Sequence, residues 1–136
     1  MTSQPDHLQF LMPGGLASPP GYSHVVKVTG GQTIYLAGQV ALDASGNLVG
    51  KGDFRAQAQQ VFENIKTALA AVGADFSHVV KLNISLLDRS QLPLLREVRS
   101  LYVNTQAPPA SALVEVRSLS HEDFLIEIEA IASLPV

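Results

Sequence analysis

Two apolar periodicities between residues 53 and 87 constrain the fold most. Behind Asp53, a residue that suits a helix N-cap, apolar side chains recur at helical spacing until Gly73, which suits the position after a helix end. Residues 79–87 instead alternate between apolar and polar side chains, as a half-buried strand does. The helix stripe consists of Phe54, Ala58, Val61, Phe62, Ile65, Leu69 and Val72, and the strand stripe of Val80, Leu82, Ile84 and Leu86. Each element has one apolar face to bury, so we expect a helix layer packed on a sheet.

The N-terminal part of the chain reads as a lead-in followed by a hairpin. Residues 1–21 hold four prolines and three glycines, and we expect them to be extended without regular structure of their own. The β-branched stretches 23–29 and 33–40 flank Gly30 and Gly31, which can adopt the positive φ of a tight turn. These two stretches are predicted to pair as a β-hairpin.

The C-terminal part adds a second helix and two strands. Ser90 is the expected N-cap of the helix, Pro93 is tolerated in its first turn, and Pro108 ends it. The predicted inner face of this helix is Leu92, Leu95, Val98, Leu101 and Tyr102, and the predicted strands are 111–116 and 124–132. The order ββ(β)αβαββ indicates a single α+β domain over residues 1–136, with one sheet carrying two helices on one face.

The composition bears on assembly and on partners. The chain is 46% hydrophobic and 15% charged, against a typical charged share of about 25%. Buried subunit contacts would explain this composition and would cover the second sheet face, although a low-charge monomer remains the alternative. The net charge of −3 and the lack of a basic stripe make nucleic acid an improbable partner. No apolar run is long enough for a membrane span and no secretory signal is evident, so the expected location is cytoplasmic.

Several classes of chemistry lack the residues they need. The chain has no cysteine, which excludes disulfides and thiolate chemistry. Its four histidines do not have the spacing of metal ligands, and we predict no metal site. Neither a serine-hydrolase elbow nor a phosphate-binding loop occurs.

Two carboxylates remain as candidates for chemistry. In the strand 124–132, Glu127 and Glu129 lie on the face opposite to Ile126 and Ile128, about 7 Å apart by strand rise. They are either part of a solvated sheet face or part of a cleft between subunits. In a cleft, partial burial would favour the protonated carboxyl and allow it to transfer protons.

Six short motifs, in order, resemble those of the Rid family, also known as YjgF or ribonuclease L-PSP proteins. The motifs are P-P-G-Y-S-H (19–24), A-G-Q-V (37–40), A-A-V-G-A (70–74), V-V-K-L (79–82), P-A-S-A-L-V-E-V (109–116) and I-E-I-E-A-I-A (126–132). The resemblance implies a chorismate-mutase-like protomer with a mixed sheet, and a homotrimer with a central barrel and three clefts between subunits. It also implies hydrolysis of reactive enamines or imines to keto acids and ammonia, without a cofactor.

The resemblance assigns roles to particular residues. Glu129 would position or activate the attacking water, and the backbone carbonyl of Leu113 would help to hold that water. Tyr22 and Gln39 would line the substrate site, and the N–H of Gly38 would meet a substrate oxygen.

Ser111 departs from the family pattern. Deaminating members carry arginine in P-A-R-S-x-V-E-V, where it grips the substrate carboxylate with two hydrogen bonds, which serine cannot reproduce. At about 1.5–3 kcal/mol per charged bond, the loss corresponds to about 10²- to 10⁴-fold in affinity. We therefore expect a substrate without the usual α-carboxylate, unless a neighbouring subunit supplies a cation.

Three functions follow from these observations. We favour a Rid-type hydrolase with Glu129 as acid and base. The alternative is a non-catalytic trimer that binds a small metabolite in its clefts or acts as a regulatory module. Endoribonuclease activity, a label that some family members carry, is less favoured because the chain is acidic and lacks a basic patch.

Overall fold

The strands and helices of the chain form two separate sheets and one helix layer. The structure, a computed structural model, describes residues 4–136. The strands are β1 (Leu8–Leu11), β2 (Val25–Val28), β3 (Gln32–Gln39), β4 (Val79–Leu86), β5 (Ala110–Glu115) and β6 (Ile126–Leu134), and the helices are α1 (Phe54–Ala70) and α2 (Leu92–Arg99). From α1 onward, this order confirms the prediction from the sequence.

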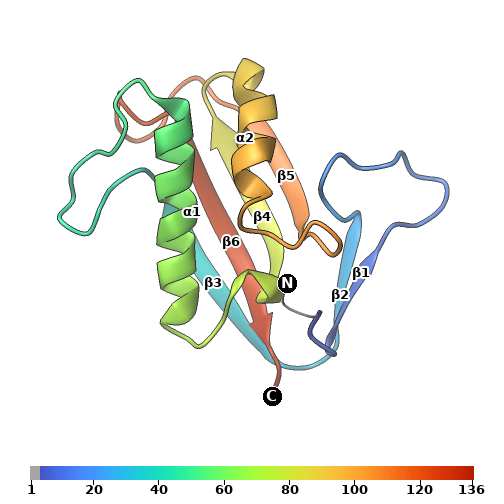
Figure 1. Cartoon of the computed structure of the whole chain (residues 1–136). Coiled ribbons are helices and arrows are strands. Elements are labelled where there is room, and N and C mark those ends of the chain that lie inside the picture. Colours follow the sequence, from blue (N-terminus) through green and yellow to red (C-terminus); the bar gives the residue numbers. More distant parts are fainter. Residues whose placement is uncertain (1–3) are drawn as a thin grey trace.

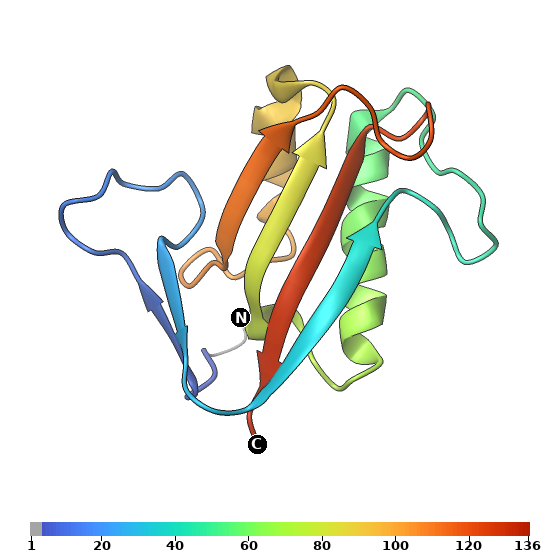
Figure 2. The same cartoon turned by 180° about the vertical axis from the view of Figure 1, so that it is seen from behind.

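The main sheet is mixed and has the strand order β3-β6-β4-β5. β4 and β5 are parallel, because α2 returns the chain to the same end of the sheet, whereas β6 is antiparallel to both β3 and β4. Both helices cover one face of this sheet (Figure 1), and the view from behind shows the other face without a covering layer (Figure 2). The α+β class with two helices on one face is thereby confirmed.

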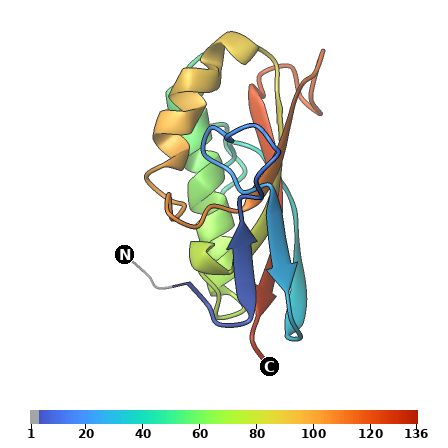
Figure 3. The ribbon, with the colours of Figure 1, turned by 90° about the vertical axis from the view of Figure 1, so that its right-hand side faces the viewer.

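The core lies between the helix layer and the sheet, which Figure 3 shows edge-on. Asp53 caps α1 as expected, since its carboxylate accepts a hydrogen bond from the Ala56 N–H at 3.1 Å. The predicted stripe of α1 is buried except for Val72, which is 45% exposed because the helix ends two residues earlier. Leu101 of the second stripe is likewise 69% exposed, because α2 ends at Arg99.

A register shift alters the predicted face of β4. Leu82, Ile84 and Leu86 are buried as expected, but Val79 is fully buried in place of Val80. The pairing of β4 with β6 is irregular between Val79 and Lys81, and an extra residue at such a bulge moves the following side chains to the other face. Periodicity alone does not reveal this shift.

Three predictions for the connecting segments are wrong. The stretches on either side of Gly30 do not form a hairpin, since β2 pairs with β1 while β3 pairs with β6 in the main sheet. The lead-in 1–21 contains strand β1, although its first three residues lie outside the described residues. Ser90 does not cap a helix: Asp88 caps a short 3₁₀ turn by accepting the Ser90 N–H, and α2 then begins with Pro93 in its first turn. The burial of Ile34 and Leu36 against β6 explains why β3 leaves its neighbour in sequence.

Within residues 4–136, no helix is both long and apolar enough to cross a membrane.

Candidate functional site

Three of the residues predicted for the site line one small cavity beside α2. We name this cavity the arginine pocket; it encloses about 180 Å³. Its lining residues are Pro20, Tyr22, Leu92, Arg96, Arg99, Ser111 and Leu113. Tyr22, Ser111 and Leu113 were expected from the sequence, whereas the two arginines were not.

Main-chain contacts attach the segment before β2 to the start of β5. The Ser23 N–H donates to the Pro109 carbonyl at 3.1 Å, and the Ser23 hydroxyl donates to the Pro108 carbonyl at 2.5 Å. Ser23 also forms an isolated parallel bridge with Ala110. These contacts, buried at Ser23, explain why Tyr22 and Ser111 share one cavity although they are far apart in sequence.

Arg99 projects from the last turn of α2 into this contact region. Arg99 is only 8% exposed, and its Nη2 donates a hydrogen bond to the Pro20 carbonyl at 3.2 Å. Gly21 has a φ of +90°, and a Cβ at this position would overlap with Nη2 of Arg99. Position 21 therefore requires glycine for two reasons: the positive φ of its backbone and the close approach of the Arg99 guanidinium.

Within residues 4–136, no acidic side chain forms an ion pair with either arginine of the pocket. Burial, and then the nearby charge of Arg96, lower the pKa of Arg99. The ion pairs found in the described part of the chain are Arg55–Glu97 and His78–Asp75, and neither involves the pocket. The pocket lining itself contains no carboxylate.

Glu129 lies on the opposite face of the sheet from the arginine pocket. In the register of β4 with β5 and β6, Asn83 stands opposite Glu129 and Ala112, whereas Ser111 stands opposite the buried Leu82. Because residues directly opposite each other share a face, Ser111 is directed to the helix layer and Glu129 to the uncovered face. Glu129 is exposed, and its Oε1 accepts a hydrogen bond from Nδ2 of Asn83 at 3.0 Å.

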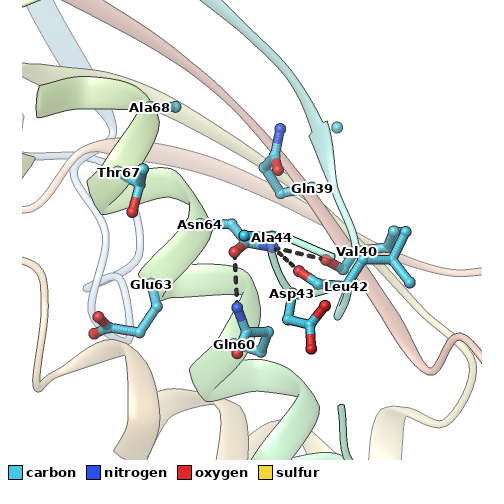
Figure 4. A pocket seen from close by; sticks show the side chains of 11 residues that line it. Gln39, Val40, Leu42, Asp43, Ala44, Gln60, Glu63, Asn64, Thr67 and Ala68 are labelled. Carbon is cyan, nitrogen blue, oxygen red and sulfur yellow. Dashed lines mark hydrogen bonds between the residues drawn. The ribbon is translucent and has the colours of Figure 1, made fainter. Parts of the chain in front are cut away.

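Gly38 and Gln39 line a different and larger cavity of about 580 Å³ beside α1, drawn in Figure 4. They lie at a register irregularity near the end of β3. A Cβ at Gly38 would lie 2.9 Å from the carboxylate carbon of Glu127, so the glycine permits this side chain to approach. Asn64 fixes the wall of this cavity by donating to two main-chain carbonyls of the loop after β3, at 3.0 and 2.9 Å.

One chain therefore distributes the predicted residues over three places. The arginine pocket is the better candidate for substrate binding, although it is the smaller cavity, because it gathers three predicted residues and two unpaired cations. The larger cavity is lined by Asp43 and Glu63 and contains no cation.

The sequence did not single out the arginines of α2 or the partner of Glu129. Arg96 and Arg99 are three residues apart and so lie on neighbouring positions of one helix face, a pattern that also describes a solvated face. Their significance depends on the segment 19–23 that packs across the helix end.

Comparisons with known proteins give a consistent result. Residues 15–134 match the family described as endoribonuclease L-PSP. The chain is 44% identical over 111 residues to protein DfrA of Myxococcus xanthus, covering 82% of this chain and 83% of that protein. It is 37% identical over 111 residues, with 81% and 83% coverage, to the 2-iminobutanoate/2-iminopropanoate deaminase of Dermatophagoides farinae. Mouse and human relatives of 36% and 34% identity have the same name.

A solved structure has a closely similar fold. The protein of unknown function from the conserved Rid family of Yersinia pestis superposes with a TM-score of 0.83 at 34% identity. The match covers 94% of this chain and 99% of that chain. The likeness therefore extends over the N-terminal segment as well as the main sheet.

Proposed function

Because this chain belongs to the endoribonuclease L-PSP family, which is also the Rid family, we propose that it hydrolyses the C=N bond of a small reactive imine or of its enamine tautomer. The name shared by the mite, mouse and human relatives, which denotes deamination of 2-imino acids, supports this reaction type. The observation in the structure that carries the proposal is the Glu129 carboxylate held by Asn83 on an uncovered sheet face.

The reaction needs one water molecule and a group that transfers protons. The water oxygen attacks the imine carbon while a carboxylate accepts one water proton and returns it to nitrogen. The carboxylate then takes the hydroxyl proton of the resulting carbinolamine and passes it to nitrogen, and the C–N bond breaks to give a carbonyl compound and ammonia. We assign the proton transfers to Glu129, whose bond from Asn83 leaves one carboxylate oxygen free to contact water.

We further propose that the chain works as a homotrimer, with the substrate in clefts between subunits. Two observations support assembly through the uncovered sheet face. Tyr35 and Val114 lie on the two edge strands of this sheet, β3 and β5, and are 78% and 52% exposed, so contact with another copy there would remove apolar surface from water. In addition, Glu129 and Ser111 face opposite sides of one sheet, so a neighbouring copy is needed to bring a Glu129 to the arginine pocket.

Position 111 supplies only a hydroxyl group to the substrate. Ser111 can make one hydrogen bond where the deaminating members are expected to make two charged ones. The proposed substrate is therefore not clamped through an α-carboxylate at this position. Tyr22 and the Leu113 main chain complete the same wall.

The proposal is tested by ammonia release from 2-iminobutanoate generated in situ by an amino-acid oxidase. We expect the wild type to accelerate release above the spontaneous rate, and Glu129→Gln to reduce the acceleration about 10²-fold or more, the usual scale of a lost general acid–base group. Glu122→Gln, an exposed glutamate in the loop before β6, is the matched control and should behave like the wild type. Equal turnover in wild type and Glu129→Gln would refute the assignment.

One observation favours a second candidate function, a trimer that binds a small metabolite without converting it. The arginine pocket contains no acidic side chain of its own chain. Without Glu129 from another copy, the pocket has no carboxylate that could transfer protons. Ligand binding that is unaffected by Glu129→Gln, together with no turnover, would favour this function. Endoribonuclease activity is not proposed, because the chain has a net charge of −3.

A further inference from the structure

We propose that Arg96 and Arg99 together bind the carboxylate of a small organic acid in the arginine pocket. This inference deepens the proposed function, on which it rests for the identity of the site, and it names the substrate class. It replaces the expectation that the substrate has no carboxylate, because the cation that Ser111 lacks is supplied by α2 of the same chain.

The charge distribution of the pocket is the first argument. Arg96 and Arg99 both line a cavity of about 180 Å³ whose lining contains no carboxylate. The acidic residue between them in sequence, Glu97, is bonded to Arg55 at 2.9 Å. A site with two cations and no protein anion attracts an anionic ligand.

The hydrogen bonding of Arg99 is the second argument. A guanidinium has five N–H donors, and the hydrogen bond found for Arg99 is the one from Nη2 to the Pro20 carbonyl. In the described part of the chain, His7 Nδ1 is the only fully buried side-chain nitrogen or oxygen without a hydrogen-bond partner. The other nitrogens of Arg99 are thus not sealed in the protein, and Arg99 is a lining residue of the arginine pocket.

The burial of this charge is the third argument. Arg99 is 8% exposed, and a charge removed from water is costly unless it is paired. The neighbouring Arg96 charge increases that cost, which is why the pKa of Arg99 is lowered by both burial and Arg96. A bound carboxylate would neutralise this repulsion and would accept the free N–H groups.

The size and the remaining lining select the ligand. A volume of about 180 Å³ holds about six water-sized groups, which fits a short keto or imino acid and is below the usual range for larger ligands. The planar fork of arginine matches the two oxygens of a carboxylate. Ser111 and Tyr22 supply hydroxyl groups for a polar atom next to the carboxylate, and Leu92 and Leu113 supply an apolar wall for a short alkyl chain.

Direct binding of the reaction product tests this inference without turnover. Titration calorimetry would compare 2-oxobutanoate with its neutral amide, 2-oxobutanamide, and with inorganic phosphate. We expect the wild type to bind 2-oxobutanoate at least tenfold more tightly than the amide or phosphate. Equal affinity for the acid and its amide, or tighter binding of phosphate, would overturn the proposal.

Arginine variants locate the binding. Arg96→Gln is the primary variant because Arg96 is exposed and its side chain makes no hydrogen bond within residues 4–136, so the fold should be retained. We expect it to weaken 2-oxobutanoate binding about 10- to 100-fold, the effect of one lost charged hydrogen bond. Arg99→Lys keeps the buried charge but loses the fork and should also weaken binding. Arg89→Gln, which removes an exposed arginine of the 3₁₀ turn before α2 and outside the pocket lining, is the matched control and should bind as the wild type does. Unchanged binding in Arg96→Gln and Arg99→Lys would refute the inference.

The experiment separates this inference from the proposed function. Glu129→Gln should bind 2-oxobutanoate normally while losing turnover. Binding that depends on the arginines in a wild type that releases no ammonia would retain the carboxylate site and reject the hydrolase. Turnover that depends on Glu129 but not on the arginines would retain the hydrolase and reject the carboxylate site.

Discussion

Replacement of Gly21 by alanine perturbs the arginine pocket without removing any of its side chains. The new Cβ would overlap with Nη2 of Arg99 and lie 3.3 Å from its Cζ. Gly21 also has a φ of +90°, where an L-residue is strained by about 1–2 kcal/mol. The guanidinium must move away from the backbone, and that movement breaks its bond to the Pro20 carbonyl.

The matched control is Gly15→Ala. Gly15 has a φ of +93°, and nothing lies within 4 Å of a Cβ at that position, so this variant carries the conformational cost alone. For Gly21→Ala we add about 1.5–3 kcal/mol for the lost charged hydrogen bond, which gives a total of about 2.5–5 kcal/mol. The expected difference between the two variants is therefore about 1.5–3 kcal/mol.

Two measurements decide the outcome. Urea unfolding gives the free energies of unfolding of the wild type and both variants, and calorimetry gives their affinities for 2-oxobutanoate. We expect Gly21→Ala to be the less stable variant and to bind the acid more weakly, while Gly15→Ala binds normally. Equal stability losses in the two variants, with unchanged affinity in Gly21→Ala, would show that Arg99 does not lie against this backbone.

Two further predictions concern stability. Gln57 is fully buried; its side chain donates hydrogen bonds to the Gly50 and Asp123 carbonyls and accepts one from the Leu125 N–H. Gln57→Leu should therefore lower the free energy of unfolding by about 2–5 kcal/mol. Urea unfolding measures this loss, and Gln59→Leu on the same helix is the control. Burial, followed by the Glu63 carboxylate, raises the pKa of Tyr102 to about 12. Since an unfolded tyrosine ionises near pH 10, the stability that the neutral phenol contributes is fully present below pH 10 and is lost as pH rises toward 12. Tyr102→Phe should remove the tyrosine ionisation near pH 12 from an ultraviolet titration and reduce the fall in the free energy of unfolding between pH 10 and 12. An unchanged titration would contradict this prediction.

The helix layer and most of the main sheet could be predicted from the sequence because one face of each element is apolar. The Asp53 cap and the buried positions of α1 follow from local spacing and were found correctly. The hairpin around Gly30 was wrong because glycine permits a turn but does not decide which strands pair across it. That choice depends on the apolar face of β3, which is buried against β6 far along the chain.

The candidate site could be predicted only in part. The motifs identified Tyr22, Ser111 and Leu113, and the structure places these residues in one cavity. Arg96 and Arg99 could not be assigned, because their role depends on the loop that crosses the end of α2. Alternation along each strand shows which of its residues share a face. Only the register of β4 against β5 and β6 shows that Ser111 and Glu129 lie on opposite faces of the sheet. Roles for Glu129, Gly38 and Gln39 stay predictions.

The opposite orientation of Ser111 and Glu129 has a consequence for how defects would spread in an assembled protein. Under the proposed arrangement, a copy that lacks Glu129 keeps its own pocket in working order and impairs the pocket of a neighbour. A copy that lacks the arginines fails only at its own pocket and still serves another copy. Each catalytic centre would then contain residues from two copies of the chain. In a cell with two alleles, one chain that lacks Glu129 and another that lacks the arginines could together form a functional centre that neither forms alone.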